Sequence, residues 1–388
     1  MLSLAGARIA VIENEYGDVG IDDGLLQQNM KERTEDEIIE MLNGCICCTV
    51  REDLIKVLKR LAQRIKLGEL RLDALVIETT GMADPAPVAQ TFFMENTCQE
   101  HFRLDGIVTL VDAKHIEQHL DEEKPEGTVN ESQRQLAFAD RIIINKIDLM
   151  PDEQDLDRVE ERIRQVNEFA PVVRCQQSSV SVDNVLNIRA FNLKALLTAQ
   201  PTFLRGPANT RHDKAISSIG IDVPGAVDLA ALHDWMNGLL SAKGNDLYRM
   251  KGILAVDKSD QRYVYHGVHM LLQGDFVEPW GVDEERGCKL IFIGKDLDHD
   301  ALREGFNECL ATPENRQKWA AQLRFAVGDR VVCNAGSEGW LAGVVVSHFY
   351  RDETFPLGRT VPYEIRLEID GGRIYAPADD DRCIRSAS

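Results

Sequence analysis

Short apolar segments recur along the first half of the chain with helical patterns between them, and this alternation restricts the possible folds more than any other feature. The segments are Arg8–Ile12, Ala74–Ile77, Gly106–Val111, Arg141–Asn145 and Val172–Arg174. None alternates polar with apolar residues, as expected of strands that are buried on both faces of a parallel sheet. Between the first two, Leu54, Leu58, Leu61 and Ile65 follow the spacing of one helix face. We therefore predict a doubly wound α/β domain over residues 1–200.

After residue 200 the regular alternation of apolar segments and helical patterns ends. Residues 201–213 contain two prolines, one glycine and few apolar residues, and predict a linker. Residues 214–312 predict an α+β domain, with strands and helices at Ile216–Val223, Leu229–Leu240, Gly252–Val256, Arg262–Leu272, Lys289–Ile293 and Ala301–Leu310. Residues 322–386 predict a small all-β barrel, with strands at Arg330–Cys333, Trp340–Ser347, Pro362–Ile369 and Arg373–Ala376.

The charge balance excludes some classes of partner. The chain has 44 basic and 64 acidic residues, a net charge of −20. Such a surface repels phosphate backbones and anionic lipids, so we expect neither nucleic acid nor a membrane as a partner. No apolar stretch is long enough for a membrane span and no signal peptide is visible. Nine cysteines are too few for a disulfide scaffold, and a cytoplasmic location is predicted.

A polar motif, Asn145-Lys146-Ile147-Asp148, follows directly on one of the apolar segments. At the end of a buried strand, the carboxylate of Asp148 can accept hydrogen bonds from N1–H and the exocyclic amino group of guanine, a donor pair that adenine lacks. An unpaired buried carboxylate costs about 1–3 kcal/mol, so such a site rejects the wrong base. Asn145 would brace the loop and the stem of Lys146 would lie along the base. The alternative is a solvated turn, but the position after a buried strand favours guanine binding.

A second polar segment, Glu78-Thr79-Thr80-Gly81, also follows a buried strand. Glu78 can hold a Mg²⁺-bound or attacking water and the backbone N–H of Gly81 can approach a γ-phosphate, so both are candidate catalytic residues. Asp112 ends the next strand in the same way and is a candidate nucleotide-binding residue. The alternative is an ordinary strand-to-helix turn with capping Asp and Thr, and it is stronger for Asp112 than for Glu78 and Gly81.

A phosphate loop of the form G-x-x-x-x-G-K-[ST] does not occur in the sequence. The first recognisable strand begins at Arg8, too close to Met1 for a preceding strand, loop and helix. Two expectations stay open: the protein does not hydrolyse nucleotide, or its natural N-terminus lies upstream of Met1.

Three of the nine cysteines lie together in the segment Gly44-Cys45-Ile46-Cys47-Cys48, just before the helix that carries Leu54. Thiols this close converge when the loop bends, and a helix N-terminus favours the thiolate form. Thiolates suit Zn²⁺ or Cu⁺ rather than Mg²⁺ or Ca²⁺. The alternatives are a redox pair or simply buried thiols, but the clustering favours a metal site. The other six cysteines are scattered and are expected to be core or surface residues.

Carboxylates and histidines elsewhere in the sequence are further candidate metal ligands. Glu13 and Asp18 follow the first apolar segment, and either can complete the thiolate site; the alternative is a solvated acidic loop. His115 and His119 have the i, i+4 spacing of a helical metal site, although a solvated helix face is the more frequent explanation. The sequence therefore predicts a metal site made of Cys45, Cys47 and Cys48 with Glu13 and Asp18.

Over residues 7–312 the sequence resembles the CobW-type metallochaperone GTPases. The segments that carry the resemblance are, in order, ARIAVIENEYGDVGIDD, NGCICCTVREDL, VIETTGMADPAPVAQTFF, LDGIVTLVDAKH and ADRIIINKIDL. The resemblance implies a P-loop-NTPase-type sheet and a nucleotide-gated metal carrier. It assigns the CxCC cysteines, with Glu13 and Asp18, to metal binding. It also assigns Glu78 and Gly81 to the second switch, and Asn145, Lys146 and Asp148 to guanine recognition.

The sequence departs from the family pattern in two places. The family begins with a strand and a GKT-type phosphate loop, which we expect upstream of the position of Met1. Residues from about 325 onward resemble a Tudor-like β-barrel that binds a peptide or protein partner.

Two functions are expected from these observations. The first is a chaperone that binds Zn²⁺, or another divalent transition metal, and transfers it to a client metalloprotein, coupled to binding and hydrolysis of GTP with Mg²⁺. The alternative is a non-hydrolysing metal-binding or scaffold protein that acts through its C-terminal barrel.

Overall fold

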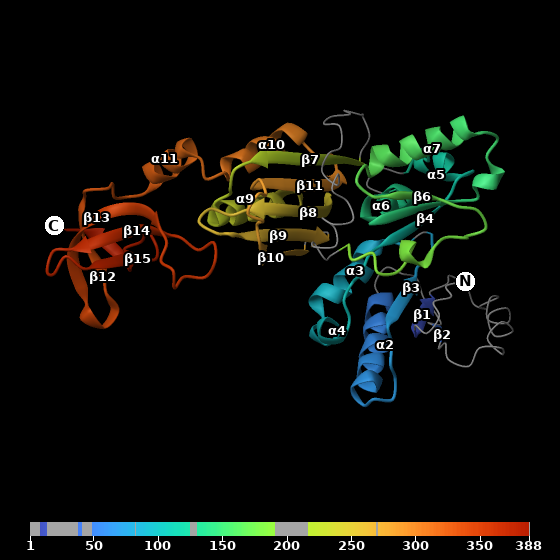
Figure 1. The fold of residues 1–388 in the computed structure, drawn as a ribbon, viewed down its shortest axis with the longest axis horizontal. Helices are drawn as coiled ribbons and strands as arrows, with labels where there is room; N and C mark the ends of the chain where they lie inside the picture. Colours follow the sequence, from blue (N-terminus) through green and yellow to red (C-terminus); the bar gives the residue numbers. More distant parts are fainter. Residues whose placement is uncertain are drawn as a thin grey trace.

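Three bodies follow one another along the longest axis of the molecule in chain order (Figure 1). The computed structural model describes residues 8–13, 38–40, 49–81, 83–124, 130–190, 216–268 and 271–387. The predicted 201–213 linker lies outside these ranges.

The first body contains two parallel sheets of three strands each. One has the order β2-β1-β3 and the other β4-β5-β6. The strands are β1 (Ile9–Glu13), β2 (Ile38–Glu40), β3 (Ala74–Glu78), β4 (Val108–Asp112), β5 (Arg141–Asn145) and β6 (Val172–Arg174). The predicted parallel α/β architecture is confirmed, but one continuous sheet is not seen: among the described strands, β3 pairs only with β1 and β4 only with β5. Leu110 on β4 is accordingly 59% exposed, whereas β5 is almost wholly buried.

Helices cover these sheets as their apolar faces require. The helices are α2 (Thr49–Lys66), α3 (Pro85–Met94), α4 (Asn96–His101), α5 (Ile116–Leu120), α6 (Glu131–Phe138) and α7 (Glu153–Val166). The predicted stripe on α2 is buried at Leu54 and Leu58, which form one cluster with Ile12 of β1. On α7, Val159 and Ile163 are fully buried in the cluster that includes β5. Amphipathic spacing therefore decides which side of each helix meets a sheet.

The central body is a five-stranded antiparallel sheet of order β10-β9-β8-β11-β7 with two helices. Its elements are β7 (Ile216–Pro224), α9 (Leu229–Lys243), β8 (Leu247–Ala255), β9 (Gln261–Val268), β10 (Leu271–Pro279), β11 (Gly287–Lys295) and α10 (His299–Glu308). Met236 of α9 and Phe306 of α10 pack in one cluster with Phe292 of the sheet. The single strand predicted at Arg262–Leu272 is wrong, because β9 and β10 are separate strands paired in antiparallel register.

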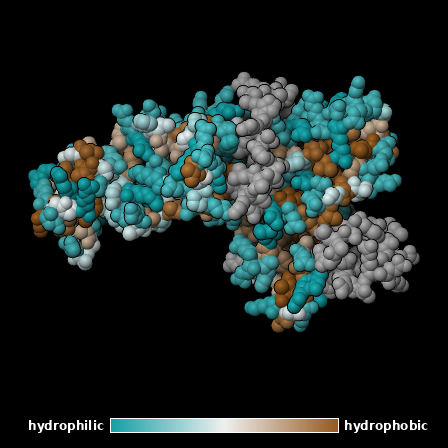
Figure 2. Space-filling model, in the orientation of Figure 1, coloured by the Kyte–Doolittle hydropathy of each residue, from teal (hydrophilic) through white to brown (hydrophobic). Residues whose placement is uncertain are grey.

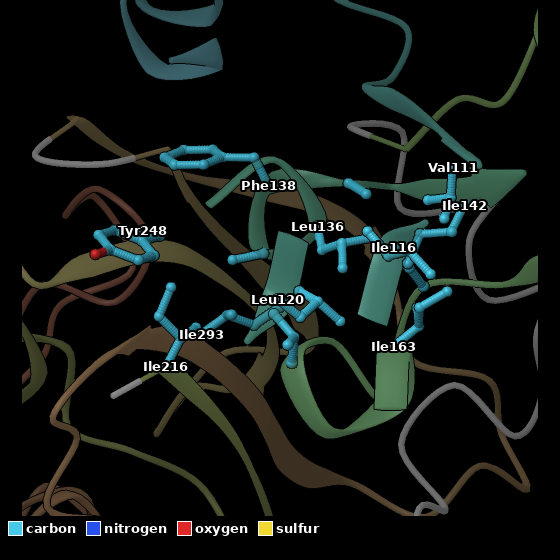
Figure 3. Packing of buried hydrophobic residues seen from close by; sticks show 14 of the residues in the cluster. Val111, Ile116, Leu120, Leu136, Phe138, Ile142, Ile163, Ile216, Tyr248 and Ile293 are labelled. Carbon is cyan, nitrogen blue, oxygen red and sulfur yellow. The ribbon is translucent and has the colours of Figure 1, made fainter. Parts of the chain in front are cut away.

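The first two bodies share one apolar core. Ile216, Tyr248 and Ile293 of the central sheet lie in the same buried cluster as Phe138 and Leu136 of α6 (Figure 3). Tyr248 stacks on Phe138 with ring centroids 5.7 Å apart. The contact is therefore a continuation of the first body's core rather than a polar surface contact.

A buried charge cluster lies beside this core. Asp140 precedes β5, and its side chain is only 1% exposed. Its carboxylate accepts hydrogen bonds from Arg249 and, at 2.5 Å, from Lys251, both on β8, and its other oxygen accepts from the backbone N–H of Ile107 at 2.9 Å. Asp140, Arg249 and Lys251 line a cavity of about 50 Å³. Buried charges of this kind are tolerated only while they remain paired.

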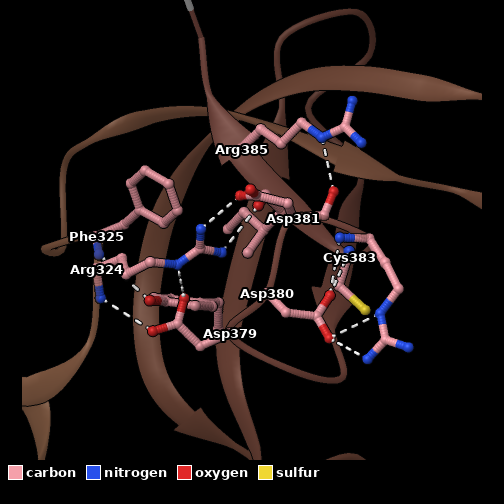
Figure 4. Close-up of polar contacts among 10 residues, drawn as sticks. Arg324, Phe325, Asp379, Asp380, Asp381, Cys383 and Arg385 are labelled. Atoms are coloured by element: carbon pink, nitrogen blue, oxygen red, sulfur yellow. Dashed lines mark hydrogen bonds and ion pairs between the residues drawn. The ribbon is translucent and has the colours of Figure 1, made fainter.

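The third body follows helix α11 (Pro313–Gln322) and is an antiparallel sheet of order β15-β14-β13-β12-β16. Its strands are β12 (Arg330–Asn334), β13 (Trp340–Tyr350), β14 (Val361–Leu367), β15 (Arg373–Ala376) and β16 (Ile384–Ser386). Because β15 and β16 remain the outer strands, the predicted closed barrel is not seen in the described residues. Arg324 anchors the start of the sheet by bonds to Asp379 at 2.8 Å and Asp381 at 2.6 Å (Figure 4).

A loop of the third body contacts the central body. Gly358 has φ +71°, and a Cβ there would lie 2.6 Å from Leu229 Cδ2 and 2.9 Å from Phe276 Cζ. Lys258 Nζ also donates to the carbonyl of Phe349 at 2.5 Å. The loop therefore approaches the central body closely enough that only glycine fits.

We expect Gly358→Ala to destabilise the third body by about 2–4 kcal/mol, because a left-handed backbone conformation and a steric clash add together. Gly371→Ala is the matched control: Gly371 has φ +73° but open space around its Cβ position, so only about 1–2 kcal/mol should be lost. Urea unfolding followed by tryptophan fluorescence measures both. Equal losses in the two variants would contradict the close contact.

No helix of the described residues is long and apolar enough to cross a membrane. Hydrophilic residues predominate on the face shown in Figure 2.

Candidate nucleotide and metal site

The loop after β5 is held by the strands on either side of it. Asn145 is buried, its Oδ1 accepts the backbone N–H of Ser178 at 3.0 Å, and its Nδ2 donates to Ser178 Oγ at 3.0 Å. Its carbonyl accepts the N–H of Ala113 at 3.0 Å. Lys146 then takes a left-handed conformation, φ 63°, and leads into a short 3₁₀ turn, Ile147–Leu149. Asn145 thus ties together the loops after β4, β5 and β6.

Asp148 lies in that 3₁₀ turn and is exposed. Within the described part of the chain, its carboxylate makes no hydrogen bond or ion pair. A backbone held by the hydrogen bonds of Asn145 therefore presents an acceptor pair to solvent, the arrangement that a ligand with two adjacent N–H donors would need. Recognition of guanine by Asp148 stays a prediction.

Asp112 lies opposite Asn145 at the end of the neighbouring strand. Its carboxylate accepts from Lys146 Nζ at 2.7 Å and from the N–H of Lys114 at 2.9 Å, and it contacts His115 Nδ1 at 3.0 Å. Burial alone would raise the pKa of Asp112, but the hydrogen bonds from Lys146, His115 and Lys114 outweigh it and hold the pKa well below its usual range. Asp112 is therefore ionised and fixes the Lys146 stem beside the loop.

The other sheet brings three glutamates to one edge. Glu13 pairs in register with Glu78 on one side and with Glu40 on the other, at the carboxyl ends of three adjacent parallel strands. Glu78 is exposed, and a Cβ at Gly81 would meet open space. Glu13 and Glu78 were expected from the sequence, whereas Glu40 was missed. The apolar pair Ile38-Ile39 before it is too short to indicate a strand by itself.

The metal motif itself is only partly described. Cys45, Cys47, Cys48 and Asp18 lie outside the described residues, and for Glu13 only the backbone is described. The helix after the motif, α2, begins at Thr49, directly after Cys48. In the sequence the motif therefore immediately precedes a helix N-terminus, an element that favours anionic groups such as thiolates.

The six described cysteines are unlike metal ligands. Five are buried and Cys383 is partly exposed. Burial raises the pKa of Cys288 and Cys309 to about 12 and that of Cys333 to about 11, so these thiols stay protonated. The described residues also hold no group of three or more His, Cys, Asp or Glu side chains that could bind a metal, and His115 is bound to Asp112 instead. This leaves the CxCC motif as the candidate that the sequence offers.

Sequence reasoning missed residues that hold the two candidate loops from a distance. Ser178 holds Asn145, and Gln135 of α6 donates to the carbonyls of Thr80 and Ala83 beside Gly81. Neither residue belongs to a motif. Only the strand-end position of Ser178, after Val172–Arg174, could have pointed to it.

Comparison with known proteins identifies the family. Residues 2–174 match the model of the CobW/HypB/UreG nucleotide-binding domain, and residues 216–310 match that of the cobalamin synthesis protein CobW C-terminal domain. The sheet of the third body lies beyond both matches.

Individual relatives point to the same family. The chain is 34% identical to the zinc chaperone YjiA of Escherichia coli over 301 residues, 78% of this chain and 89% of the relative. It is 30% identical to the zinc chaperone CobW of Sinorhizobium over 321 residues, 77% and 88% of the two chains. The crystal structure of Zn(II)-bound YjiA GTPase from E. coli superposes with a TM-score of 0.60 at 28% identity, covering 79% of this chain and 91% of that one. The chain therefore belongs to the CobW family of nucleotide-binding proteins.

Proposed function

We propose that this protein is a GTP-dependent zinc chaperone, which binds Zn²⁺ through Cys45, Cys47 and Cys48 and transfers it to a client metalloprotein. The observation that carries the proposal is the loop after β5, where the fixed backbone around Asn145 presents the unpaired carboxylate of Asp148. The relatives named zinc chaperone, and the zinc bound in the crystal structure of YjiA, support the choice of metal.

The geometry of the loop after β5 supports nucleotide binding there. The guanine ring would lie along the stem of Lys146, which Asp112 holds at 2.7 Å, and its N1–H and amino group would donate to Asp148. Asn145 makes no contact with the base in this scheme; it keeps the three loops in place. Binding to a preformed loop avoids the entropic cost of ordering it.

Hydrolysis involves the other sheet. GTP arrives with Mg²⁺, and we propose that Glu78 orients the attacking water while the N–H of Gly81 approaches the γ-phosphate. Glu78 lies at the end of a strand paired with β1. A displacement of Glu78 and its strand would therefore also move the backbone of Glu13, a residue of the proposed metal site.

Zinc is the cargo. Three thiolates leave one coordination position for a carboxylate such as Glu13 or Asp18, and an open fourth position lets a client ligand enter before the metal leaves. Because Glu13 and Glu78 share one strand pairing, nucleotide state and metal release can bias the same edge of the sheet.

The experiment is Asp148→Asn with fluorescent nucleotides. Loss of two charge-assisted hydrogen bonds should weaken GTP binding by about 10²- to 10³-fold. Xanthosine triphosphate should bind the Asp148→Asn variant more tightly than it binds the unmodified protein, because its C2 carbonyl can accept a hydrogen bond from the new amide.

Asp152→Asn is the matched control, since it removes one exposed carboxylate nearby and asparagine caps α7 as well as aspartate does. GTP and ATP affinities that are equal in the unmodified protein would refute guanine recognition. GTP binding without hydrolysis would support the non-hydrolysing alternative.

A further inference from the structure

Helix α6 contacts the proposed switch segment on one side and the central body on the other. Gln135 Nε2 donates to the carbonyl of Ala83 at 2.9 Å and to that of Thr80 at 3.3 Å. Its own carbonyl accepts from Thr109 Oγ1 on β4 at 2.9 Å. One side chain therefore fixes two carbonyls of the turn that follows Glu78, from a backbone that is itself attached to the neighbouring sheet.

The preceding residue, Arg134, makes contacts in both directions at once. Its guanidinium pairs with Asp84 at 3.0 Å, and its side chain is only 17% exposed. Asp84 caps α3 by accepting the N–H of Ala86 at 3.0 Å. The same guanidinium lies over the ring of Tyr248 on β8, 5.0 Å from the ring centroid. A planar guanidinium can stack on a ring while it binds a carboxylate at its edge, which an ammonium group does less well.

The end of α6 is held by the central body as well. Phe138 stacks on Tyr248 at 25° between ring planes, and its carbonyl accepts a hydrogen bond from Arg249. Since α6 spans only Glu131–Phe138, its two ends cannot move independently by much. The helix is a short rigid connection between the turn at Thr80 and Ala83 and the sheet of the central body.

We propose that Arg134 and Gln135 are positioning residues that couple the turn at Thr80, Ala83 and Asp84 to Tyr248 of the central body. If the turn changes conformation, either the two Gln135 hydrogen bonds and the Arg134–Asp84 ion pair break, or helix α6 moves with the turn. Movement of α6 in turn displaces Arg134 and Phe138 from the Tyr248 ring. The coupling to nucleotide rests on the proposed function, whereas the coupling between turn and central body does not.

The first test compares two glutamines of the same helix. Gln135→Leu removes the bonds to the turn, so hydrogen exchange of the Ala83 amide, which bonds the Thr80 carbonyl, should become about tenfold faster. Gln133→Leu is the matched control, because Gln133 Nε2 donates to the carbonyl of Leu120 instead, at 2.9 Å. Equal exchange of Ala83 in the two variants would overturn the role of Gln135.

The second test changes the other end of the connection. Tyr248→Leu keeps an apolar side chain but removes the ring. Exchange at Ala83 should become about three- to tenfold faster, although the Ala83 amide bonds the Thr80 carbonyl and not Tyr248. Tyr248→Phe retains the ring and should behave like the unmodified protein, which separates coupling from loss of fold. Arg134→Lys should resemble Tyr248→Leu, and the double variant should be no worse than either single one. Additive effects, or an unchanged Ala83 amide in Tyr248→Leu, would refute the coupling.

The affinities for GTP and GDP test whether the coupling reaches the nucleotide site. If the coupling serves the nucleotide site, Tyr248→Leu also changes the ratio of GTP to GDP affinity, and Gln133→Leu does not. If the unmodified protein binds neither nucleotide, the proposed function fails, while the exchange measurements still decide on the coupling.

Discussion

Replacing Asp140 by asparagine is expected to lower the free energy of unfolding by about 3–5 kcal/mol, the usual effect of removing one partner from a buried ion pair. The carboxylate of Asp140 is 1% exposed and holds both Arg249 and Lys251. An amide of the same shape leaves these cations facing a neutral group. Urea unfolding, followed by the circular dichroism of the first two bodies, measures the loss.

The matched control is Asp157→Asn. Asp157 pairs with Arg174 at 2.6 Å, but its side chain is 63% exposed, so water replaces the lost partner and about 0–1 kcal/mol is expected. If Asp140→Asn were as mild as this control, the buried cluster would not hold the two bodies together.

The pH dependence of stability should show the same cluster. Burial opposes ionisation of Asp140, but Arg249 and Lys251 outweigh it and lower its pKa. The folded chain therefore binds fewer protons than the unfolded chain near pH 4, so this stabilisation is present above about pH 4 and is lost on acidification. Burial, helped by Arg249, lowers the pKa of Lys251 to about 8, so its contribution makes stability rise between pH 8 and about pH 10.

The second large effect concerns zinc. Changing Cys45, Cys47 and Cys48 together to serine should reduce bound zinc from one equivalent to none and weaken the affinity by at least about 10³-fold, because a neutral hydroxyl is a poor ligand for Zn²⁺. Competition with a chromogenic chelator measures the affinity, and metal analysis after dialysis measures the stoichiometry.

Cys383→Ser serves as the control, because Cys383 is the one cysteine among the described residues that is not buried. Retention of zinc by the triple variant would refute the CxCC site. Loss of zinc in Cys383→Ser would move the site to the third body.

The sequence predicts the fold where apolar runs are long or evenly spaced. The segments at Ala74 and Arg141 became β3 and β5 because continuous apolar residues suit strands covered on both faces. The division into β9 and β10 was missed because no proline or Asn-Gly pair lies between Val268 and Leu271 in the sequence. Helix α11 was missed although Thr312 caps it and Pro313 opens it, because it buries little: Asn315 is its one buried residue.

Some residues of the candidate site could be predicted from the sequence and others could not. Residues in contiguous motifs, such as Asn145 and Asp148, could be named from the sequence. Gln135 and Arg134 could not, because the contacts of Gln135 join segments 52 to 55 residues apart and Arg134 reaches Tyr248 in another body. For Ser178, whose partner Asn145 lies 33 residues away, the position after a predicted strand was the one available signal. Such contacts depend on how helices settle on sheets, which spacing within one segment does not encode.

The two three-stranded sheets of the first body also affect how the molecule behaves in a crowded solution. Among the described strands, β3 and β4 each offer one edge whose backbone groups no other described strand pairs, and Leu110 on β4 adds exposed apolar surface. An unpaired edge is a template on which a foreign strand can extend the sheet. The first body, which presents the nucleotide loop, therefore also offers strand edges and exposed apolar surface on which aggregation can start.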